Sequence, residues 1–385
     1  MACEQLTRLG DVIELEDVKR EPISSRDRKD RKGSYPYYGA QGIVDYLDDY
    51  TYEGDYLLVA EDGENLRSRK NPIANAASGK FRVNNHAHVI AESEKCNLVF
   101  LRHLLNMTDI SAYVTGSTQP KLSQSNLCAM KLPLPSMAEQ NAIANVLSLF
   151  DRKIELNNQL NDYLFELVSS VFAHRFSDNV NTTELKNVLS ISTKALKPQE
   201  HADEIWEHYS IPAFDEKHRP IFEPASGIKS NKYQIDSECI LISKLNPSTK
   251  RIWMPCCSSN NAVCSTEFIV YRPYLKEYKS FYYVAIDSPR FTDYLLEHVS
   301  GSTGSRQRAQ PKDTLNYLMP NPDNEEIKDF CTFADPIYRH IQINEQQTAK
   351  LELLRETLLP KLMSGAIDVS KVDLTQLTNN HLADY

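Results

Sequence analysis

The stretch AEQNAIANVLSLFDRKIELNNQLNDYLFELVSSVFAHRF, residues 138–176, decides the fold of this chain. Its apolar residues recur every three or four positions, which is the spacing that one face of a helix presents. A heptad that starts at Ile143 predicts a seam for a partner helix along this face. The residues that we assign to this seam are Ile143, Val146, Phe150, Asn157, Leu160, Leu164 and Leu167. Ser136 and Glu139, just before the stretch, form a capping-box pattern that marks the start of the helix.

A second stretch repeats this heptad pattern 187 residues further on, counted from Asn157 to Asn344. An asparagine at the same heptad place in both copies is typical of a buried polar residue that fixes the register of a helix pair. The residues that we assign to the second seam are Phe330, Ile337, Asn344, Leu351, Leu354 and Leu358. Pro336 predicts a kink or a restart in this helix, and Gly365 predicts its end. We therefore interpret the chain as a duplication in which a long helix closes each half.

Shorter segments repeat as well. LGDVIELEDVKREP, from Leu9, is echoed by LKNVLSISTKALKP, from Leu185, and the apolar segment 54–63 is echoed by 237–246. GSTQPKL, residues 116–122, is echoed by GSTGSRQRA, residues 301–309, and this match pairs Gln119 with Gln307. These echoes predict two similar globular parts, each followed by its long helix.

The composition excludes several classes of protein. With 41% hydrophobic and 25% charged residues, the 385-residue chain is typical of a soluble protein of two or three domains. It contains no apolar run long enough to span a bilayer and does not begin like a secretory signal, so we expect it in the cytoplasm, with no membrane partner. The eight cysteines are scattered, which favours reduced thiols over disulfides or a zinc site. The net charge of −9 requires any DNA-binding surface to be local.

Two segments carry residues that suit a binding site. GSYPYYGAQGIVDYL, residues 33–47, predicts loop backbone with exposed aromatic side chains, which suit contacts with bases or sugars. Tyrosines packed over a small sheet are the alternative. His86 and His88 fall on one face of a predicted strand, but no third ligand has a supporting spacing. We therefore interpret both histidines as structural and expect no metal.

The order of these motifs resembles the specificity subunit of Type I restriction-modification systems. The motifs are GxYPYYGAxG, GDYLLVxEDG, NNHAHV, GSTQPKL, LPLPxxxEQ and the first long helix, then GSTGSRQRA and a second helix that ends in LLPKLMSG. The resemblance covers nearly the whole chain. It implies an α+β fold with two sheet-rich target recognition domains, separated by two long antiparallel coiled-coil helices in a pseudo-twofold repeat. The expected parts are a first recognition domain, a first helix, a second recognition domain, a second helix and a tail, at residues 1–136, 137–177, 178–323, 324–365 and 366–385.

The resemblance also implies partners and a division of labour. Each recognition domain would read one half of a bipartite sequence in double-stranded DNA. The helices would receive two methyltransferase subunits, which hold S-adenosylmethionine and modify adenine at N6. Restriction subunits would supply cleavage with ATP and Mg²⁺, and this chain would hold no cofactor and catalyse nothing. The sequence agrees, because it lacks an (N/D)PP(Y/F) loop, a GxGxxG turn and a GxxxxGK(S/T) phosphate loop.

Candidate DNA-binding residues follow from the side chains that pair with base edges, mainly arginine with guanine and glutamine or asparagine with adenine. The family transfer is firmest for the GSTQPKL and GSRQRA loops. The candidates are Tyr37, Tyr38, Gln41, Arg67, Lys80, Arg82, Thr118, Gln119 and Lys121 in the first half, and Lys244, Lys250, Arg251, Arg306, Gln307 and Arg308 in the second.

Two further expectations concern the whole molecule. A helix pair of about 50 Å, at 1.5 Å per residue, would act as a ruler for the spacer between the half-sites, so four residues inserted near Asn157 should change the preferred spacer. The alternative function is a coiled-coil scaffold that binds proteins and reads no DNA, which the acidic net charge favours.

Overall fold

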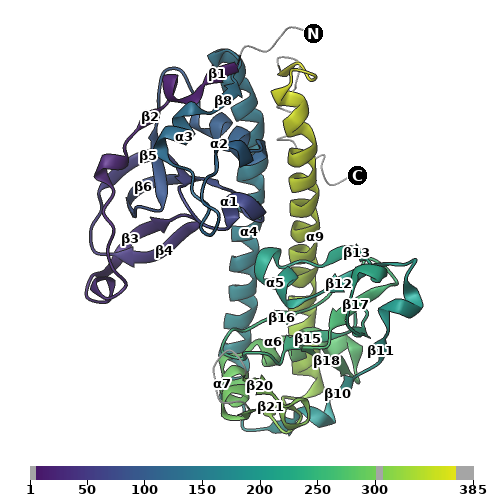
Figure 1. Ribbon diagram of the computed structural model, residues 1–385. Helices are drawn as coiled ribbons and strands as arrows, with labels where there is room; N and C mark the ends of the chain where they lie inside the picture. The colour runs from purple at the N-terminus through teal and green to yellow at the C-terminus, as the bar shows by residue number, and fades with distance from the viewer. Residues whose placement is uncertain (1–5, 301–306, 370–385) are drawn as a thin grey trace. The chain divides into compact units, whose positions relative to one another are not determined.

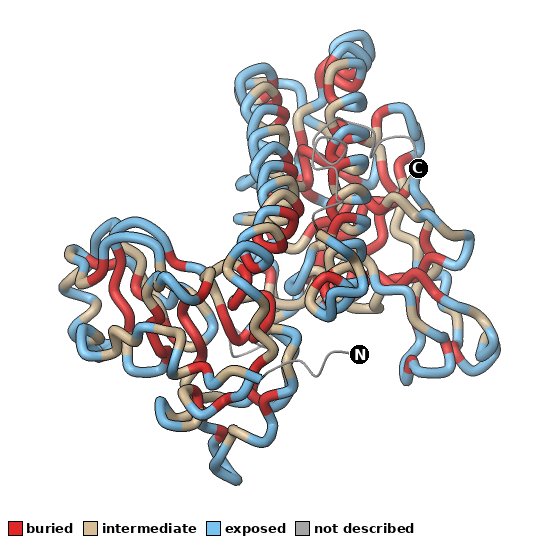
Figure 2. The backbone as a smooth tube through the Cα atoms, turned by 90° about the horizontal axis from the view of Figure 1, so that it is seen from above, coloured by how far each residue is buried: buried red, intermediate tan, exposed pale blue. Residues whose placement is uncertain are grey.

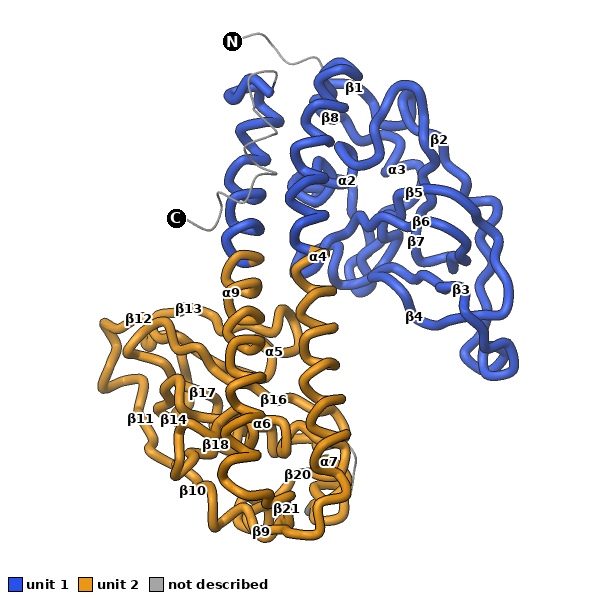
Figure 3. Tube along the Cα trace, turned by 180° about the vertical axis from the view of Figure 1, so that it is seen from behind, with its two compact units in different colours: residues 1–154, 349–385 blue, residues 155–348 orange. Residues whose placement is uncertain are grey.

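The computed structural model describes residues 6–300 and 307–369 of the chain (Figure 1). These residues form two compact units, each of which includes part of both long helices (Figure 3). The first unit comprises residues 1–154 and 349–385, and the second comprises residues 155–348. The long helices are α4 (Met137–Phe176) and α9 (Asn324–Met363), with 40 residues each. No helix among the described residues is long and apolar enough to cross a membrane.

The first unit is built on a six-stranded mixed sheet with the order β2-β7-β5-β6-β3-β4. Its strands are β2 (Glu14–Leu15), β3 (Lys32–Gly39), β4 (Gly42–Leu47), β5 (Tyr52–Ala60), β6 (Ala74–Val83) and β7 (Ala87–Ala91). The short helices are α1 (Asn65–Ser68), α2 (Leu98–Met107) and α3 (Gln124–Ala129), and β1 (Leu6–Arg8) pairs with β8 (Lys131–Pro133). Strand β5 is buried on both faces, since Leu57 and Val59 pack towards α2 while Leu58 packs with Phe81 on the opposite side. This explains why its apolar run does not alternate with polar residues.

The second unit contains two sheets. A four-stranded antiparallel sheet has the order β10-β18-β15-β16, and a five-stranded mixed sheet has the order β11-β14-β17-β12-β13. The strands of the first are β10 (Leu189–Ser192), β15 (Ile240–Ser243), β16 (Ile252–Trp253) and β18 (Phe268–Pro273). Those of the second are β11 (Ala195–Leu196), β12 (Ile205–Tyr209), β13 (Ile221–Pro224), β14 (Lys232–Gln234) and β17 (Ala262–Ser265). Further elements are α5 (Ile211–Lys217), α6 (Lys279–Asp287), α7 (Pro289–Glu297), α8 (Pro311–Thr314) and the pairs β9 (Thr182–Glu184) with β21 (Leu318–Pro320) and β19 (Val299–Ser300) with β20 (Arg308–Ala309).

The duplication is present in the backbone of the two units. Strand β1 pairs with β8 directly before α4, and β9 pairs with β21 directly before α9, in the same antiparallel arrangement. The residue after each first strand makes the same contact, because Leu9 N donates to Met130 O and Leu185 N donates to Tyr317 O. The sheet order β2-β7-β5-β6 of the first unit recurs as β10-β18-β15-β16 in the second. The internal repeat predicted from the sequence is therefore confirmed.

Both long helices begin with the same local device. Ser136 N donates to Glu139 Oε2 at 3.0 Å and Glu139 N donates to Ser136 Oγ at 3.4 Å, which confirms the predicted capping box. Asp323 and Glu326 exchange the same two hydrogen bonds at the start of α9. Helix α9 runs without interruption through Pro336, so the predicted restart is wrong. Buried Ala334 and Tyr338 on either side of this proline keep the helix packed.

Within the second unit the two helices are antiparallel, because residue numbers decrease along α9 as the residue numbers of their partners increase along α4. Asn157 Nδ2 donates to Gln347 Oε1 at 2.9 Å, and Asn344 Nδ2 donates to Asn161 Oδ1 at 2.8 Å. Further along, Phe172 meets Phe330 with ring centroids 5.6 Å apart. The two predicted register asparagines are thus buried in the helix pair, and Asn157 Nδ2 also donates to the backbone oxygen of Asn344 at 3.5 Å.

The predicted seam is correct at the first position of each heptad and mostly wrong at the second. Buried residues follow the Ile143 series after four positions, at Leu147, Asn161 and Val168, and Val146 is the buried residue that follows after three. Leu160, Leu167 and Leu354, which we assigned to the seam, are exposed. Figure 2 shows buried and exposed residues alternating along the long helices. The remaining seam residues are buried or partly buried against the cores: Ile143, Val146, Phe150, Asn157, Leu164, Phe330, Ile337, Asn344, Leu351 and Leu358. Steps of three and four residues both fit the apolar pattern of α4, because a second apolar stripe lies beside the packed one.

Candidate nucleic-acid interface

In each unit, the loop that follows a central sheet strand pairs with a second polar loop, and we call these two loops the loop pair. In the first unit, Gly63 N donates to Pro120 O and Leu122 N donates to Glu61 O, so the end of β5 is tied to the GSTQPKL segment. In the second unit, Asn246 N donates to Gln307 O and Ala309 N donates to Lys244 O, so the end of β15 is tied to the QRA segment. Between these bonds, Asp62 faces Lys121 and Leu245 faces Arg308 as isolated bridges.

The shared hydrogen bonds correct the sequence match between the two loops. Pro120 and Gln307 occupy equivalent places, as do Lys121 and Arg308. The earlier match of Gln119 with Gln307 is therefore shifted by one residue. At the same offset Gln119 corresponds to Arg306, which lies outside the described residues. The match was wrong because it aligned the two loops on their glutamines, whereas the shared backbone bonds place Gln307 at the position of Pro120.

Arg67 binds the backbone of the GSTQPKL loop in the first unit. Its guanidinium donates to Ser117 O at 2.9 Å and to Gly116 O. Gly116 has a φ of +86°, and a Cβ there would lie 2.2 Å from Gln119 O, so this turn requires glycine. Thr118, Gln119 and Lys121 are exposed on the loop. Arg67 thus positions a loop that presents polar side chains to the solvent.

Charged side chains beside the same loop form a network of ion pairs. Lys121 Nζ lies 3.1 Å from Glu61 Oε1, and Arg20 Nη1 donates to Glu61 Oε2 at 2.6 Å. Burial opposes the ionisation of Glu61, but the hydrogen bonds from Arg20 and Lys121 outweigh it and lower its pKa. His88 contacts Asp17 Oδ2 through Nδ1 at 2.6 Å and donates from Nε2 to Leu122 O at 2.8 Å.

Asp17, Glu61 and His88 place their ligand atoms within 4.8 Å of one another, which is close enough for a metal ion. The guanidinium of Arg20 already binds Glu61 and lies 3.2 Å from Asp17 Oδ2, and both ring nitrogens of His88 are in use. Arg20 therefore supplies the positive charge that a metal would bring, and His88 is a structural residue. His86 makes its own pair with Asp62 at 2.7 Å.

The equivalent loop of the second unit carries different charges. Lys244 occupies the place of Glu61, and Arg308 pairs with Glu267 at 3.2 Å. Asn246 adopts a left-handed conformation with a φ of +50°, which asparagine tolerates better than most residues. Lys244 and Gln307 are partly exposed and Arg308 is exposed. The two units therefore present the same backbone frame with different side chains.

Lys250 and Arg251 lie at the end of the same turn, next to β16, and have structural contacts. Lys250 Nζ donates to Asp287 O at 3.0 Å and pairs with Asp287 Oδ1 at 2.6 Å, at the carboxyl end of α6. Arg69 does the same in the first unit, where it donates to Leu105 O and Asn106 O at the end of α2. A cation at this end of a helix stabilises the exposed carbonyls and the helix dipole. Arg251 makes a bidentate pair with Asp215 on α5.

The tyrosine-rich segment is a β-hairpin and not the predicted loop. Tyr37 is buried, accepts a hydrogen bond from Ile23 N at 2.9 Å and donates to Glu21 O at 3.4 Å. Tyr38 packs edge-on against Phe81, with centroids 5.5 Å apart. The alternative interpretation, in which tyrosines pack over a small sheet, is confirmed for these two residues. Gln41 is exposed in the hairpin turn.

Two cations of β6 were also candidates. Lys80 is exposed and lies over the ring of Tyr50, 4.7 Å from its centroid. Arg82 is only 5% exposed and its guanidinium is held by Glu21 at 2.8 Å and by Asp49 at 2.6 Å. Arg82 therefore stabilises the sheet. Sequence reasoning missed Arg20 and Arg69, because a basic run or an isolated arginine gives no sign of which carboxylate or helix end it meets.

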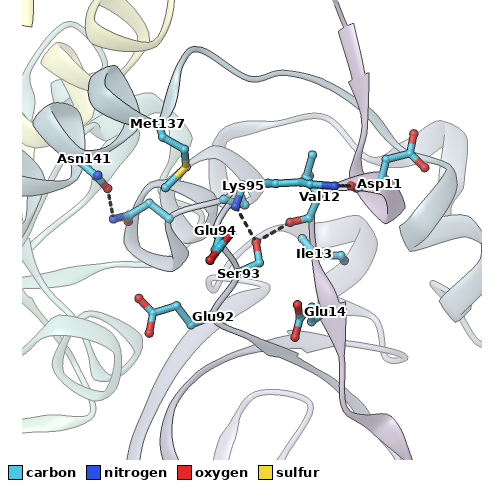
Figure 4. A pocket seen from close by; sticks show the side chains of 12 residues that line it. Asp11, Val12, Ile13, Glu14, Glu92, Ser93, Glu94, Lys95, Met137 and Asn141 are labelled. Atoms are coloured by element: carbon cyan, nitrogen blue, oxygen red, sulfur yellow. Dashed lines mark hydrogen bonds between the residues drawn. The ribbon is translucent and has the colours of Figure 1, made fainter.

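A cleft in the first unit of about 760 Å³ is a poor place for nucleic acid (Figure 4). Four of its lining residues are Asp11, Glu14, Glu92 and Glu94, whereas Lys95 is its single cation. Glu14 and Glu92 lie on opposite sides of the opening in Figure 4. Carboxylates arranged in this way repel phosphates, so the acidic cleft does not belong to the interface.

Comparisons with known proteins agree with the motif order. Residues 5–164 match the family model described as Type I restriction modification DNA specificity domain. A putative type I restriction enzyme specificity subunit of Haemophilus influenzae is 37% identical over 139 residues, which are 36% of this chain and 35% of that protein. The chain therefore spans about a third of this relative's length in the matched stretch.

Two longer matches cover most of the chain. The type I restriction enzyme MjaIX specificity subunit of Methanocaldococcus jannaschii is 24% identical over 353 residues, covering 82% of this chain and 80% of that protein. The crystal structure of a type I restriction-modification S subunit from M. genitalium superposes with a TM-score of 0.60 at 17% identity, covering 93% and 95% of the two chains. The predicted fold class is confirmed by this likeness.

Proposed function

We propose that this chain is a non-catalytic DNA-recognition subunit that reads a bipartite target in double-stranded DNA, because residues 5–164 match the model of the type I restriction modification DNA specificity domain. The observation that carries the proposal is the loop pair repeated in both units. The same backbone bonds hold Glu61 to Leu122 and Lys244 to Ala309, while the exposed side chains differ. Two copies of one frame with different side chains suit two half-sites of different sequence.

The proposed parts keep the boundaries expected from the sequence. Residues 1–136 and 178–323 are the two recognition domains, residues 137–177 and 324–365 are the helices, and residues 366–385 are a tail. In this arrangement each domain reads its half-site with its own loop pair. The helix pair sets the spacer, and a four-residue insertion near Asn157 should change it.

The proposed DNA contacts are the candidates of the two loops, of which Arg306 lies outside the described residues. They are Thr118, Gln119 and Lys121 in the first unit, with Arg67 as the residue that positions them, and Lys244, Arg306, Gln307 and Arg308 in the second. Gln41 and Lys80 are peripheral candidates on the hairpin and its neighbouring strand. We assign the other candidates to the fold. The rings of Tyr37 and Tyr38 pack within the first unit. The cationic groups of Arg82, Lys250 and Arg251 are held in ion pairs.

The second apolar stripe of α4 supports a protein partner. Leu156, Leu160, Tyr163 and Leu167 are 50%, 41%, 69% and 46% exposed and recur at steps of four, three and four residues. This spacing matches a seam for one more helix, and an exposed stripe of large apolar residues is typical of an interaction surface. We propose that helices of two methyltransferase subunits occupy such stripes. Those subunits would bring S-adenosylmethionine, and restriction subunits would bring ATP and Mg²⁺.

A mobility-shift titration tests DNA recognition. The chain is assembled with its methyltransferase subunit, and bound duplexes are selected from a random library to define the target. Lys121→Ala and Arg308→Ala should each weaken binding to the selected duplex and reduce the salt slope by about 1, since each removes one contact near phosphate. Lys95→Ala, in the acidic cleft, is the matched control and should change neither quantity.

The scaffold is the second candidate function, and the acidic cleft and the net charge of −9 favour it. A scaffold assembles with the methyltransferase subunit but selects no duplex. Absence of an enriched sequence in the presence of an intact protein complex would therefore contradict DNA recognition and support the scaffold.

A further inference from the structure

A single carboxylate of the first unit joins three helices. Asp151 on α4 accepts hydrogen bonds from Arg102 Nη2 and, at 2.5 Å, from Arg355 Nη1, and its Oδ2 lies 3.1 Å from His103 Nε2. Arg102 and His103 belong to α2, and Arg355 belongs to α9. We call these four residues the Asp151 clamp.

The clamp links the globular part of the unit to both long helices. Helix α2 is fixed to the sheet by Phe100, Leu101, Leu104 and Leu105, which are fully or almost fully buried. Arg102 and His103 extend from α2 towards α4, so their bonds to Asp151 restrain the whole domain relative to α4. Arg355 binds the other oxygen of the same carboxylate. Movement of the domain against either helix would therefore break at least one of these bonds.

A second polar contact completes the attachment. Asn97, the N-cap of α2, donates its backbone N–H to Gln140 Oε1 at 3.0 Å and its Nδ2 to Asn141 Oδ1 at 2.9 Å. Gln140 and Asp151 are about 16 Å apart along α4, at 1.5 Å per residue. Two directional contacts separated along one helix restrict the rotation of α2 against it, because each requires a defined donor–acceptor geometry.

The clamp is suited to orientation more than to net stabilisation. Its four side chains are between 9% and 27% exposed, so their desolvation offsets much of the attraction. Guanidinium groups bind a carboxylate only in a narrow range of geometries. Without the carboxylate, Arg102 and Arg355 would also face each other as uncompensated like charges.

We propose that Asp151 is a positioning residue that holds the first recognition domain in one orientation on the two long helices, and so fixes the spacer length that the assembled complex accepts. This inference rests on the proposed function. It assigns to the clamp no contact with DNA and no part in choosing the bases of either half-site.

The test measures methylation by the complex of the full chain with its methyltransferase subunit. The substrates are duplexes with both half-sites constant and spacers lengthened or shortened by one or two base pairs. For Asp151→Asn, the ratio of the initial rate at the best spacer to that at the neighbouring spacers should fall by about 5-fold or more, because looser positioning relaxes the geometric requirement. The base preference within each half-site should stay unchanged.

Arg355→Gln provides a second variant that leaves Asp151 paired with Arg102 and His103. It should lower the same ratio by about 2-fold, since only the α9 contact is lost. Asp162→Asn, an exposed position on α4, is the matched control and should keep the wild-type ratio. Wild-type ratios in both clamp variants, or an altered base preference in Asp151→Asn, would overturn the inference. A wild-type complex without any spacer preference would instead contradict the proposed function.

Discussion

The two units attach their globular parts to the long helices with opposite chemistry. In the first unit Arg102, two residues after buried Phe100, meets Asp151 of the long helix. In the second unit Tyr283, two residues after buried Phe281, meets Tyr338 with ring centroids 5.3 Å apart. Asp151 and Tyr338 are separated by 187 residues, as Asn157 and Asn344 are.

This difference shows which features the duplication has preserved. The backbone frame, with its strand order, caps and loop pair, is common to both units. The side chains at the junction have diverged into an ionic cluster in one unit and an aromatic cluster in the other. We therefore expect the two junctions to respond differently to mutation and pH, and the five predictions below test this contrast.

The largest expected effect belongs to the aromatic junction. Phe330 is fully buried and contacts the rings of Phe172, Phe176 and Phe281. Phe330→Ala should lower the free energy of unfolding of the second unit by about 3–5 kcal/mol, because it leaves a cavity in a packed core. Both tryptophans, Trp206 and Trp253, lie in this unit, so denaturant titration followed by tryptophan fluorescence reports it directly. A loss below about 1 kcal/mol would mean that the junction is loosely packed.

The ionic junction should be next in size. Asp151→Asn should destabilise the first unit by about 2 kcal/mol, because it leaves two guanidiniums without their carboxylate. Hydrogen exchange of α2 amides measures this effect, and the fluorescence midpoint of the second unit should stay at its wild-type value. Equal shifts of both readouts would contradict independent junctions.

The pH dependence of this variant follows from the pKa of Asp151. Burial raises this pKa, but the hydrogen bonds with His103 and Arg355 and the charges of Arg102 and His103 outweigh burial and hold it well below the ordinary value. A lowered pKa in the folded state stabilises the protein above the unfolded-state pKa of about 3.9, and this contribution is lost as the pH falls below it. The difference between wild type and Asp151→Asn should therefore shrink below about pH 4.

A smaller effect is expected in the middle of the helix pair. Asn344→Leu removes the donor for Asn161 Oδ1 and should destabilise the second unit by about 1–2 kcal/mol, since a buried acceptor is left without a partner. The double variant Asn161→Leu with Asn344→Leu should recover most of this loss, because both polar groups are replaced. A thermodynamic cycle of these variants measures the coupling, and simple additivity would rule out a direct pair.

The smallest effect concerns Glu345, which faces His218 at 3.7 Å beside the aromatic junction. Burial raises the pKa of Glu345 to about 7, and burial lowers the pKa of His218. A raised carboxylate pKa means that stability falls as the pH rises from its ordinary value through about 7. Glu345→Gln should therefore raise the melting temperature of the second unit by roughly 2–4 °C at pH 8 and leave it nearly unchanged at about pH 4, below the ordinary pKa of the carboxyl group. The same difference at both pH values would exclude titration of Glu345 as the cause.

The sequence predicts the long helices and the internal repeat better than it predicts which side chains are in contact. Helix periodicity, the Ser136 capping pattern and the repeated asparagines predict both long helices and the duplication, because each depends on local spacing. The second seam position was wrong because Leu160 and Leu167 are as apolar as the residues that pack. The seam and the partner-facing stripe cannot be told apart by hydrophobicity alone.

The candidate site shows the same limit. Exposed loop residues such as Gln119 and Lys121 follow from the turn residues around them. Arg82 was misjudged because its partners, Glu21 and Asp49, are distant in sequence and only the sheet brings them together. The Asp151 clamp was missed for the same reason, since its four residues come from three separate helices.

The measurement that tests the central claim most directly is the sequencing of methylated adenines in a host that carries this chain with its methyltransferase subunit. Two recognition units of one frame predict a bipartite motif, with two specific halves and a non-specific spacer of constant length. Methylation at one contiguous motif, or a pattern that stays the same when this chain is removed, would contradict the account.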